Sequence, residues 1–493
     1  MPVATIHLDH SYASELPGFS VAWRPEPSPA PQSLFFNAPL ADELGLDITA
    51  PSSLAVFAGN AVPEGAEPVA QAYAGHQFGN FSPQLGDGRA LLLGEVVDRA
   101  GRRRDIALKG SGRTPFSRGG DGKAAVGPML REALIGEAMH ALRIPTTRAL
   151  AVVATGAPVV REPVQPGAVL TRVAASHIRV GTFQFFAARG DVERVRQLAD
   201  YTIARHDADL AGAPHRYLHL LERVAERQAR LIAQWMNVGF IHGVMNTDNM
   251  AVSGETIDYG PCAFVEAYDP HAVFSSIDTQ GRYAFGNQPT IAQWNLARFA
   301  ETLLALQGDA AGQAVASATR VIEAFPAIYR RHLLAGQRAK LGLQSEDAGD
   351  AQLADDWLAL LHAAQADFTL AWRRLADAAA GNDAPLRALF ADAAAPDAWL
   401  TRWRERCARE DVDVADTSAA RAQRMRRVNP RLIARNHRVE EALAAAATDG
   451  DLGPFDRLLA ALRRPFDDHP DDASYAEPAP AEVTAAYQTF CGT

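Results

Sequence analysis

The stretch HGVMNTDNMAVSGETIDYG, residues 242–260, carries oxygen-bearing side chains on both sides of a predicted turn. Its apolar segments MAV (250–252) and TID (256–258) flank the turn SGE, which predicts a tight hairpin with Asn249 and Asp258 at its two ends. A carboxamide and a carboxylate held together suit a hard cation such as Mg²⁺, which keeps other coordination positions for phosphate oxygens or water. The stretch therefore indicates a metal–nucleotide site, although an Asx turn with a capped loop would explain the same residues without a ligand.

A lysine and a glutamate upstream extend this prediction. Lys109 ends an apolar strand, and Glu132 follows on the next predicted helix. Protein kinases hold phosphates and metal with a strand lysine, a helix glutamate and a later Asn and Asp pair. On a helical wheel, however, Glu137 lies closer to the apolar stripe of this helix than Glu132 does. The residues alone therefore leave open which glutamate meets the lysine.

The residue expected to act as a base is missing from the kinase pattern. In the loop H-R-D-L-x-x-x-N the catalytic aspartate stands five residues before the asparagine. Counting back from Asn249 places His242 at the histidine and Val244 at the aspartate, and valine cannot accept a proton. The triplet Asp-Tyr-Gly (258–260) stands where kinases have Asp-Phe-Gly, and a new carboxylate, Asp248, adjoins the asparagine. Either the site is catalytically silent, or its base has moved to serve a different reaction.

Composition indicates a folded chain that does not bind nucleic acid. The 493 residues are 48% hydrophobic and 22% charged, enough for two or three domain-sized units or one bilobal enzyme. The formal net charge of -10 gives no overall footprint for DNA or RNA. The basic run at 421–438 is interpreted as a solvated helical face.

Cysteine usage and the N-terminal sequence predict a cytoplasmic protein. The three cysteines, Cys262, Cys407 and Cys491, indicate a reducing compartment without a disulfide framework. The first residues lack the pattern of a signal or transit peptide, and no run of about 18 apolar residues marks a membrane span. We expect a cytoplasmic monomer without membrane contact.

The order of predicted elements favours an α+β chain with a kinase-like, bilobal fold: a strand-rich N-lobe, a helical C-lobe and a helical C-terminal extension. The Pro-, Ala- and Gly-rich segment 24–66 is predicted to be irregular, and 90–98 and 104–110 are predicted to be antiparallel neighbouring strands. The Gly-rich segment 110–123 leads into a predicted helix over 127–143. Three more strands are expected after it, at 149–155, 159–162 and 168–174.

From about residue 183 the pattern is helical, including a helix over 217–240 that should end at Gly239, and beyond residue 290 nearly all of it is helix. The predicted division is an N-terminal wrapping extension, an N-lobe, a C-lobe core with the catalytic and metal loops, and a helical extension: 1–66, 67–165, 166–305 and 306–493.

Several long motifs resemble the selenoprotein O family, a group of kinase-fold proteins also called pseudokinases. They cover residues 70–300 densely: YAGHQFGNFSPQLGDGRALLLGE (73–95), DIALKGSGRTPFSRGGDGKA (105–124), LREALIGEAMHALRIPTTRAL (130–150), LTRVAASHIRVGTF (170–183), GFIHGVMNTDNMAVSGETIDYGPCAF (239–264) and, farther on, NPRLIARNH (429–437). Strings of this length are far more specific than a lone Gly-rich loop.

The resemblance implies an enzyme that transfers AMP from ATP to Ser, Thr or Tyr hydroxyls of proteins, with ATP bound in the orientation opposite to that in kinases. It implies roles for matching residues: Gly86, Gly88 and Arg89 against the nucleotide; Lys109, Asp121, Gly122, Arg172 and Arg179 around the phosphates; Asn249 and Asp258 on Mg²⁺ or Mn²⁺, with Asp258 also contacting the nucleotide; and Asp248 as general base. It also favours Glu132 over Glu137 as the partner of Lys109.

Two other functions stay open at this point. Phosphotransfer to a small molecule would use a loop of the form HGD-x-H-x-x-N, and Val244 in place of its aspartate argues against it. A silent nucleotide-binding scaffold would need no Asp248. Cys491, third from the end, stands where some eukaryotic relatives carry selenocysteine, and both a redox role and an ordinary tail cysteine are open.

Overall fold

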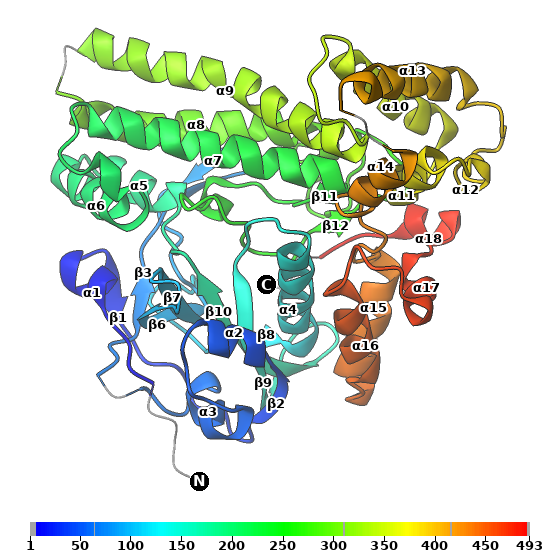
Figure 1. Ribbon diagram of the computed structural model, residues 1–493. Helices are drawn as coiled ribbons and strands as arrows, with labels where there is room; N and C mark the ends of the chain where they lie inside the picture. Colours follow the sequence, from blue (N-terminus) through cyan, green and yellow to red (C-terminus); the bar gives the residue numbers. More distant parts are fainter. Residues whose placement is uncertain (1–5, 64, 309–310, 415–416, 491–493) are drawn as a thin grey trace.

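The computed structural model describes residues 6–63, 65–308, 311–414 and 417–490, and it shows an α+β chain (Figure 1). One antiparallel sheet runs in the order β1-β3-β6-β7-β10-β9-β2, with β8 paired to β10. Its strands are β1 (Ser20–Ala22), β2 (Gln32–Phe36), β3 (Val69–Gln71), β6 (Ala90–Val97), β7 (Arg103–Lys109), β8 (Ala124–Ala125), β9 (Arg148–Val159) and β10 (Gln165–Ala174).

The two strands expected at 90–98 and 104–110 are confirmed as the antiparallel neighbours β6 and β7. Their apolar residues are buried, except Val97 at the end of β6, which is 52% exposed. Asp98 closes the turn between them by accepting a hydrogen bond from the backbone N–H of Arg102 at 2.9 Å. The register places Lys109 opposite Ala90 at the end of the pair, where the lysine side chain meets the cavity described below.

The separate strand expected at 159–162, the second of the three after the helix, is wrong. Strand β9 runs unbroken to Val159, and Val160 is 77% exposed in the connection to β10. Two neighbouring valines gave this segment the look of a strand, but the second lies on the surface.

The prediction that 24–66 is irregular is wrong in part. Strand β2 pairs with β9 at the sheet edge, and helices α2 (Ala38–Glu43) and α3 (Ala50–Phe57) follow it. Asn37 caps α2 by accepting a hydrogen bond from the backbone N–H of Leu40 at 3.3 Å. Pro39 and Pro51 lie in the first turns of α2 and α3, where proline is tolerated, and the short apolar segments complete the sheet and its core.

Helix α4 (Val126–Ala141) packs against the sheet, as predicted for 127–143. The helical pattern after residue 183 divides at Gly190, which adopts a φ of 71° between two helices. The helix expected over 217–240 is confirmed as α7, and Gly239 ends it in the left-handed conformation with a φ of 76°. Above the sheet lie α5 (Val180–Ala187), α6 (Val192–His206), α7 (Arg216–Val238), α8 (Gln288–Leu303) and α9 (Ala311–Lys340) (Figure 1).

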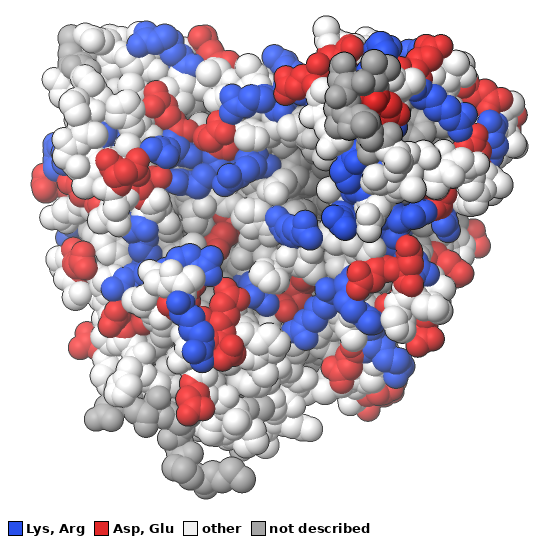
Figure 2. Space-filling view, in the orientation of Figure 1, with Lys and Arg blue, Asp and Glu red and all other residues white. Residues whose placement is uncertain are grey.

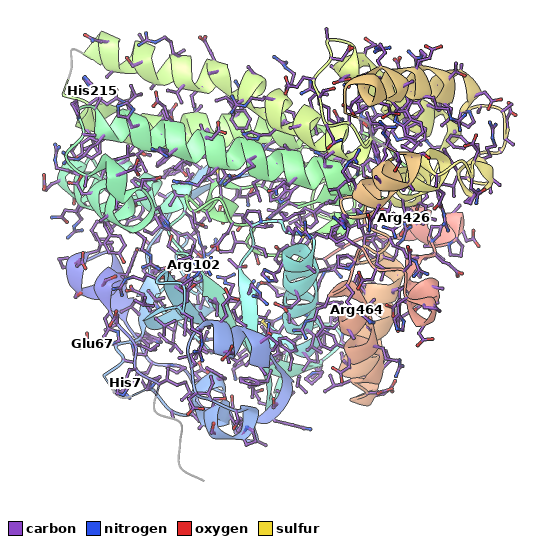
Figure 3. All side chains as sticks on the ribbon, viewed as in Figure 1. His7, Glu67, Arg102, His215, Arg426 and Arg464 are labelled. Carbon is purple, nitrogen blue, oxygen red and sulfur yellow. The ribbon has the colours of Figure 1, made fainter. Side chains whose placement is uncertain are left out.

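The C-terminal helices return to the sheet side of the molecule. Helix α4 lies between the sheet and α15 and α16 (Figure 1), and Arg463 after α16 pairs with Glu137 of α4 at 2.9 Å. Arg464, labelled in Figure 3, pairs with Asp472 at 3.2 Å. The helices after α9 are α10 (Asp350–Ala364), α11 (Phe368–Ala379), α12 (Ala384–Arg387), α13 (Asp397–Val414), α14 (Ser418–Arg426), α15 (Asn436–Ala444), α16 (Gly453–Leu462), α17 (Ala473–Ala476) and α18 (Ala481–Ala486), and α10 to α14 lie at the upper right of Figure 1, away from the sheet.

Short elements complete the chain: α1 (Ser11–Glu15), the pair β4 (Gly75–Gln77) and β5 (Asn80–Ser82), and the pair β11 (Phe240–Ile241) and β12 (Ala263–Phe264). Among the described helices, none is long and apolar enough to cross a bilayer. Acidic and basic side chains are interspersed on the face shown in Figure 2. Cys262 and Cys407 are buried free thiols, and Cys491 lies outside the described residues. The proposed domain boundaries and the likeness to kinases stay predictions.

Candidate active site

One cavity of about 510 Å³ brings together nearly all the residues singled out in the sequence. It lies beside the start of β6 and the end of β7 and reaches the loop that follows α7. Those that line it are Gly86, Gly88, Arg89, Lys109, Asp121, Gly122, Arg172, Arg179, Asp248, Asn249 and Asp258. Glu132 is the exception, because it lies behind Lys109 on α4.

Lys109 joins the sheet to helix α4 and to the loop that carries Asp258. Its Nζ lies 2.6 Å from Oε1 of Glu132 and 2.5 Å from Oδ1 of Asp258. The same Glu132 oxygen accepts a hydrogen bond from the backbone N–H of Tyr259 at 3.1 Å. The alternative partner, Glu137, instead pairs with Arg148 at 2.8 Å and with Arg463. The geometry therefore settles the choice between the two glutamates in favour of Glu132.

Asp248 stands on a single 3₁₀ turn, Thr247–Asn249, with its side chain in the cavity. It is 8% exposed, and its Oδ1 has no hydrogen-bond partner within the described part of the chain. Its other oxygen accepts a long hydrogen bond from Nε2 of Gln77, at 3.5 Å. Burial raises the pKa of Asp248 to about 6. A carboxylate in this state can accept a proton near neutral pH.

Asn249 and Asp258 line the same cavity, but the hairpin predicted to join them is wrong. Ala251 forms a bridge with Arg179, and Thr256 forms one with Thr146, so the two halves pair with distant segments. Local alternation in the sequence could not reveal these long-range partners.

The side chains of Asn249 and Asp258 fit a cation through their oxygens. Nδ2 of Asn249 donates to the carbonyl of Val244 at 3.0 Å, which leaves Oδ1 for another ligand. Asp258 has a φ of 72°, a conformation that non-glycine residues rarely adopt. Burial alone would raise its pKa, but Lys109 holds it well below the usual range. No group of three or more His, Cys, Asp or Glu suited to a metal exists among the described residues, so the site would rely on these two ligands.

His242 holds the loop together through both ring nitrogens. Its Nε2 lies 2.8 Å from the carbonyl oxygen of Ile257, and its Nδ1 accepts from the backbone N–H of Val244 at 3.4 Å. Tyr259 is buried next to Phe240, with ring centroids 6.1 Å apart. These contacts connect the segment that carries Asp248 to the segment that carries Asp258.

Two loops approach so closely that they need glycine. Gly86 has a φ of 77°, and a Cβ there would lie 2.3 Å from the ring of Phe116. Gly122 has a φ of 68°, and a Cβ there would lie 2.1 Å from a backbone oxygen of Gly112. Next to it, Asp121 accepts two hydrogen bonds from Arg161, which lower its pKa to about 2. The glycines thus shape the loops, and the negative charge of Asp121 is balanced by Arg161.

Arg179 begins helix α5 and is held in the cavity by two contacts. Its guanidinium lies 4.3 Å from the centre of the Tyr73 ring, and its Nη2 lies 3.8 Å from Oδ1 of Asp87. Sequence reasoning had named neither Tyr73 nor Asp87. Both lie inside the quoted motif 73–95, Asp87 between two of the predicted glycines, and this adjacency was the available signal.

The charges of the cavity favour a polyanionic ligand. Basic side chains outnumber acidic ones in its lining, with Arg89, Lys109, Arg113, Arg118, Lys123, Arg161, Arg172 and Arg179 against Asp87, Asp121, Asp248 and Asp258. Several of the basic residues come from the Gly-rich segment 110–123, which the sequence had marked without naming them. Such a concentration of positive charge suits phosphate groups.

Comparison with known proteins identifies a matching family and several similar proteins. A family model described as protein adenylyltransferase SelO matches residues 2–463. The protein nucleotidyltransferase YdiU of Cereibacter sphaeroides is 62% identical over 492 residues, 99% of this chain and 100% of the relative. That of Chromobacterium violaceum is 62% identical over 479 residues, 96% and 99% of the two chains. That of Rhizobium etli is 58% identical over 496 residues, 100% and 98% of the two chains.

Proposed function

The chain belongs to the SelO family of protein adenylyltransferases, and from this premise we propose that it transfers AMP from ATP to Ser, Thr or Tyr hydroxyls of proteins, releasing pyrophosphate. As a full-length relative of protein nucleotidyltransferases, it is an enzyme of nucleotidyl transfer to proteins. The choice of ATP, of AMP as the group transferred and of these hydroxyls as acceptors is the proposal.

The observation that carries the proposal is the position of Asp248. Val244 occupies the place of the kinase base, while Asp248 faces the same cavity with an unpaired, buried carboxylate oxygen. A silent scaffold has no need of a buried carboxylate without a partner, since burying such a group costs free energy. A base that has moved along the loop fits a reaction at a different phosphorus atom.

The chain's own residues suit this reaction. Arg172 and Arg179 present planar guanidinium groups to the cavity, which match the terminal phosphates and would leave the α phosphorus toward the acceptor. Asp248 would take the proton of the acceptor hydroxyl while the hydroxyl oxygen forms a bond to the α phosphorus. The bond from that phosphorus to the bridging oxygen of the β phosphate breaks, and pyrophosphate leaves.

Asn249, through Oδ1, and Asp258 would hold a divalent cation, Mg²⁺ or Mn²⁺. When bound, this cation neutralises charge on the phosphates. Lys109 would meet the phosphates as well, with Glu132 holding it in place. We further propose a cytoplasmic location, supported by the buried free thiols of Cys262 and Cys407, and a monomeric state.

A label-transfer assay tests the proposal. The purified chain is incubated with a divalent cation and with ATP labelled at the α phosphate or, separately, at the γ phosphate, and covalent label is measured on the chain itself and on lysate proteins. The proposal expects label from the α position alone. Label from the γ position alone would identify a kinase, and ATP binding with no label from either would support a scaffold.

A further inference from the structure

Arg172 reaches the cavity from β10, and one hydrogen bond holds its side chain. Its Nε donates to Nε2 of His177 over 3.2 Å. Within the described residues, neither terminal nitrogen of this guanidinium has a hydrogen bond to another protein group. The two terminal nitrogens are therefore available to a ligand, and the orientation of the guanidinium depends on His177.

The contact with Arg172 fixes the protonation of His177. An arginine nitrogen can only donate, so Nε2 must be the acceptor and the ring proton must be on Nδ1. Nδ1 lies 3.0 Å from Oδ2 of Asp105, and the backbone N–H of His177 donates to the same oxygen at 2.8 Å. Burial lowers the pKa of His177, which keeps the ring neutral at neutral pH.

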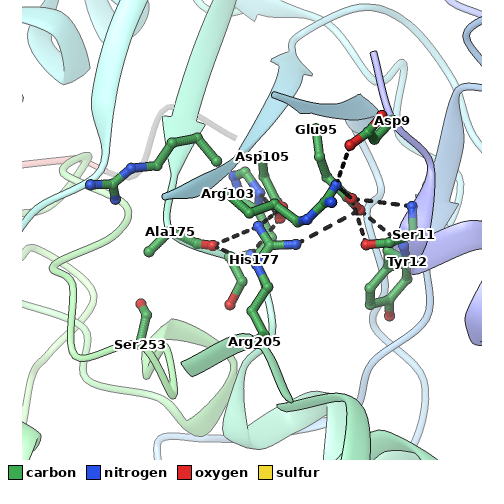
Figure 4. Close-up of polar contacts among 12 residues, drawn as sticks. Asp9, Ser11, Tyr12, Glu95, Arg103, Asp105, Ala175, His177, Arg205 and Ser253 are labelled. Carbon is green, nitrogen blue, oxygen red and sulfur yellow. Dashed lines mark hydrogen bonds and ion pairs between the residues drawn. The ribbon is translucent and has the colours of Figure 1, made fainter. Parts of the chain in front are cut away.

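Asp105 is itself held from the opposite side. Nη2 of Arg205, on α6, donates to Oδ1 of Asp105 at 2.5 Å and to the carbonyl of Ala175 at 2.6 Å (Figure 4). Glu95 lies beside Arg205 and accepts a hydrogen bond from the backbone N–H of Ser11 at 3.1 Å. The chain of contacts thus runs from the N-terminal helix α1 through the sheet to the cavity. It gives His177 a rigid support outside the cavity lining.

We propose that His177 is a positioning residue, which fixes the plane of the Arg172 guanidinium so that its two free nitrogens meet the terminal phosphates of the nucleotide. This inference rests on the proposed function only for the identity of the ligand as a nucleoside triphosphate. Arg179 has separate supports in Tyr73 and Asp87, so the effect of His177 passes through Arg172 alone.

Two polar substitutions separate the two sides of the imidazole. His177→Asn keeps an amide near the position of Nδ1 and loses the acceptor that faces Arg172. His177→Gln places an amide oxygen near the position of Nε2 and keeps that acceptor. We expect His177→Asn to weaken ATP binding about tenfold, as the loss of one charge-assisted hydrogen bond predicts, and His177→Gln to stay within about threefold of the unsubstituted chain.

The readout is the dissociation constant of ATP and of AMP, measured by calorimetry for each variant alone and combined with Arg172→Met. AMP lacks the terminal phosphates, so its affinity should change little. In the Arg172→Met background His177→Asn should cause no further loss of ATP affinity. The matched control is His206→Asn, at a half-buried histidine that bonds Ser176 and does not line the cavity, and it should leave ATP affinity unchanged.

Three results would overturn the inference: equal losses for ATP and AMP, an undiminished effect of His177→Asn in the Arg172→Met background, or a Gln variant as weak as the Asn variant. These results concern binding alone. If the chain bound ATP and the cycle behaved as expected but no α label reached protein, the proposed function would fall and the role of His177 would stand.

Discussion

Two segments face the same cavity and treat their aspartates in opposite ways. In the segment 246–249, Asp248 is buried, one of its oxygens has no hydrogen bond within the described residues, and burial raises its pKa to about 6. In the segment 257–260, the side chain of Asp258 is 33% exposed, it contacts Lys109 at 2.5 Å, and its pKa is lowered. The environments of the two carboxylates therefore shift their pKa values in opposite directions.

The difference assigns different work to each group. A carboxylate with a raised pKa and one oxygen without a hydrogen bond can accept a proton, whereas one kept ionised by a lysine can only serve as a negative ligand. His242 contacts the carbonyl of Ile257 in the second segment and accepts a hydrogen bond from the backbone N–H of Val244, two residues before the first segment. We interpret the loss of the kinase aspartate at Val244 as a relocation of the base.

The largest expected effect comes from removing the base. Asp248→Asn keeps the size of the side chain but cannot accept the proton, so we expect the rate of α-label transfer to fall about a thousandfold. ATP should bind at least as tightly, because a negative charge leaves the cavity. The rate is measured at saturating ATP and cation. A variant that retained a tenth or more of the rate would show that Asp248 is not the base.

A third buried aspartate outside the cavity sharpens the comparison through stability. Burial alone would raise the pKa of Asp105, but Arg205 and His177 lower it from 3.8 to about 2. Its ionised form therefore stabilises the fold above the unfolded pKa by about 2 kcal/mol. This contribution should be lost as pH falls from 3.8 toward 2.

Urea unfolding of the unsubstituted chain and of Asp105→Asn measures this contribution. The difference in unfolding free energy should be full at pH 7 and should shrink in acid. A difference that did not change with pH would mean that the charge of Asp105 contributes nothing.

The smallest effect is expected from the two glutamates of α4. Glu132→Gln weakens the charge that holds Lys109, so ATP affinity should fall about tenfold. Glu137→Gln should leave ATP affinity unchanged and lower the unfolding free energy by about 1 kcal/mol, because it weakens the contacts with Arg148 and Arg463. The two variants serve as controls for each other. Equal losses of ATP affinity would contradict the assignment of Lys109 to Glu132.

Local chemistry explains what could be predicted from the sequence. The end of α7 was predictable, because a glycine in the left-handed conformation is a local signal. The pairing of β6 with β7 was also predictable from a local signal, because a short turn joins two apolar runs. The long family motifs led to the residues of the cavity, although the roles of these residues remain proposals.

Long-range packing explains what could not be predicted. A helical wheel could not choose between Glu132 and Glu137, because α4 has the sheet on one side and α16 on another, so both glutamates are buried. The hairpin at 250–258 was wrong because Ala251 and Thr256 pair with segments far away in the sequence. The sequence gives no sign of a role for His177, because that role depends on contacts with both Arg172 and Asp105.

The most direct test of the division of work between the two aspartates is a calorimetric titration of ATP into Asp248→Asn and Asp258→Asn, each with and without Mg²⁺ or Mn²⁺. The account predicts that Asp248→Asn binds ATP with the same dependence on the cation as the unsubstituted chain, whereas Asp258→Asn loses that dependence. Equal behaviour of the two variants, with both keeping or both losing the cation dependence, would contradict it.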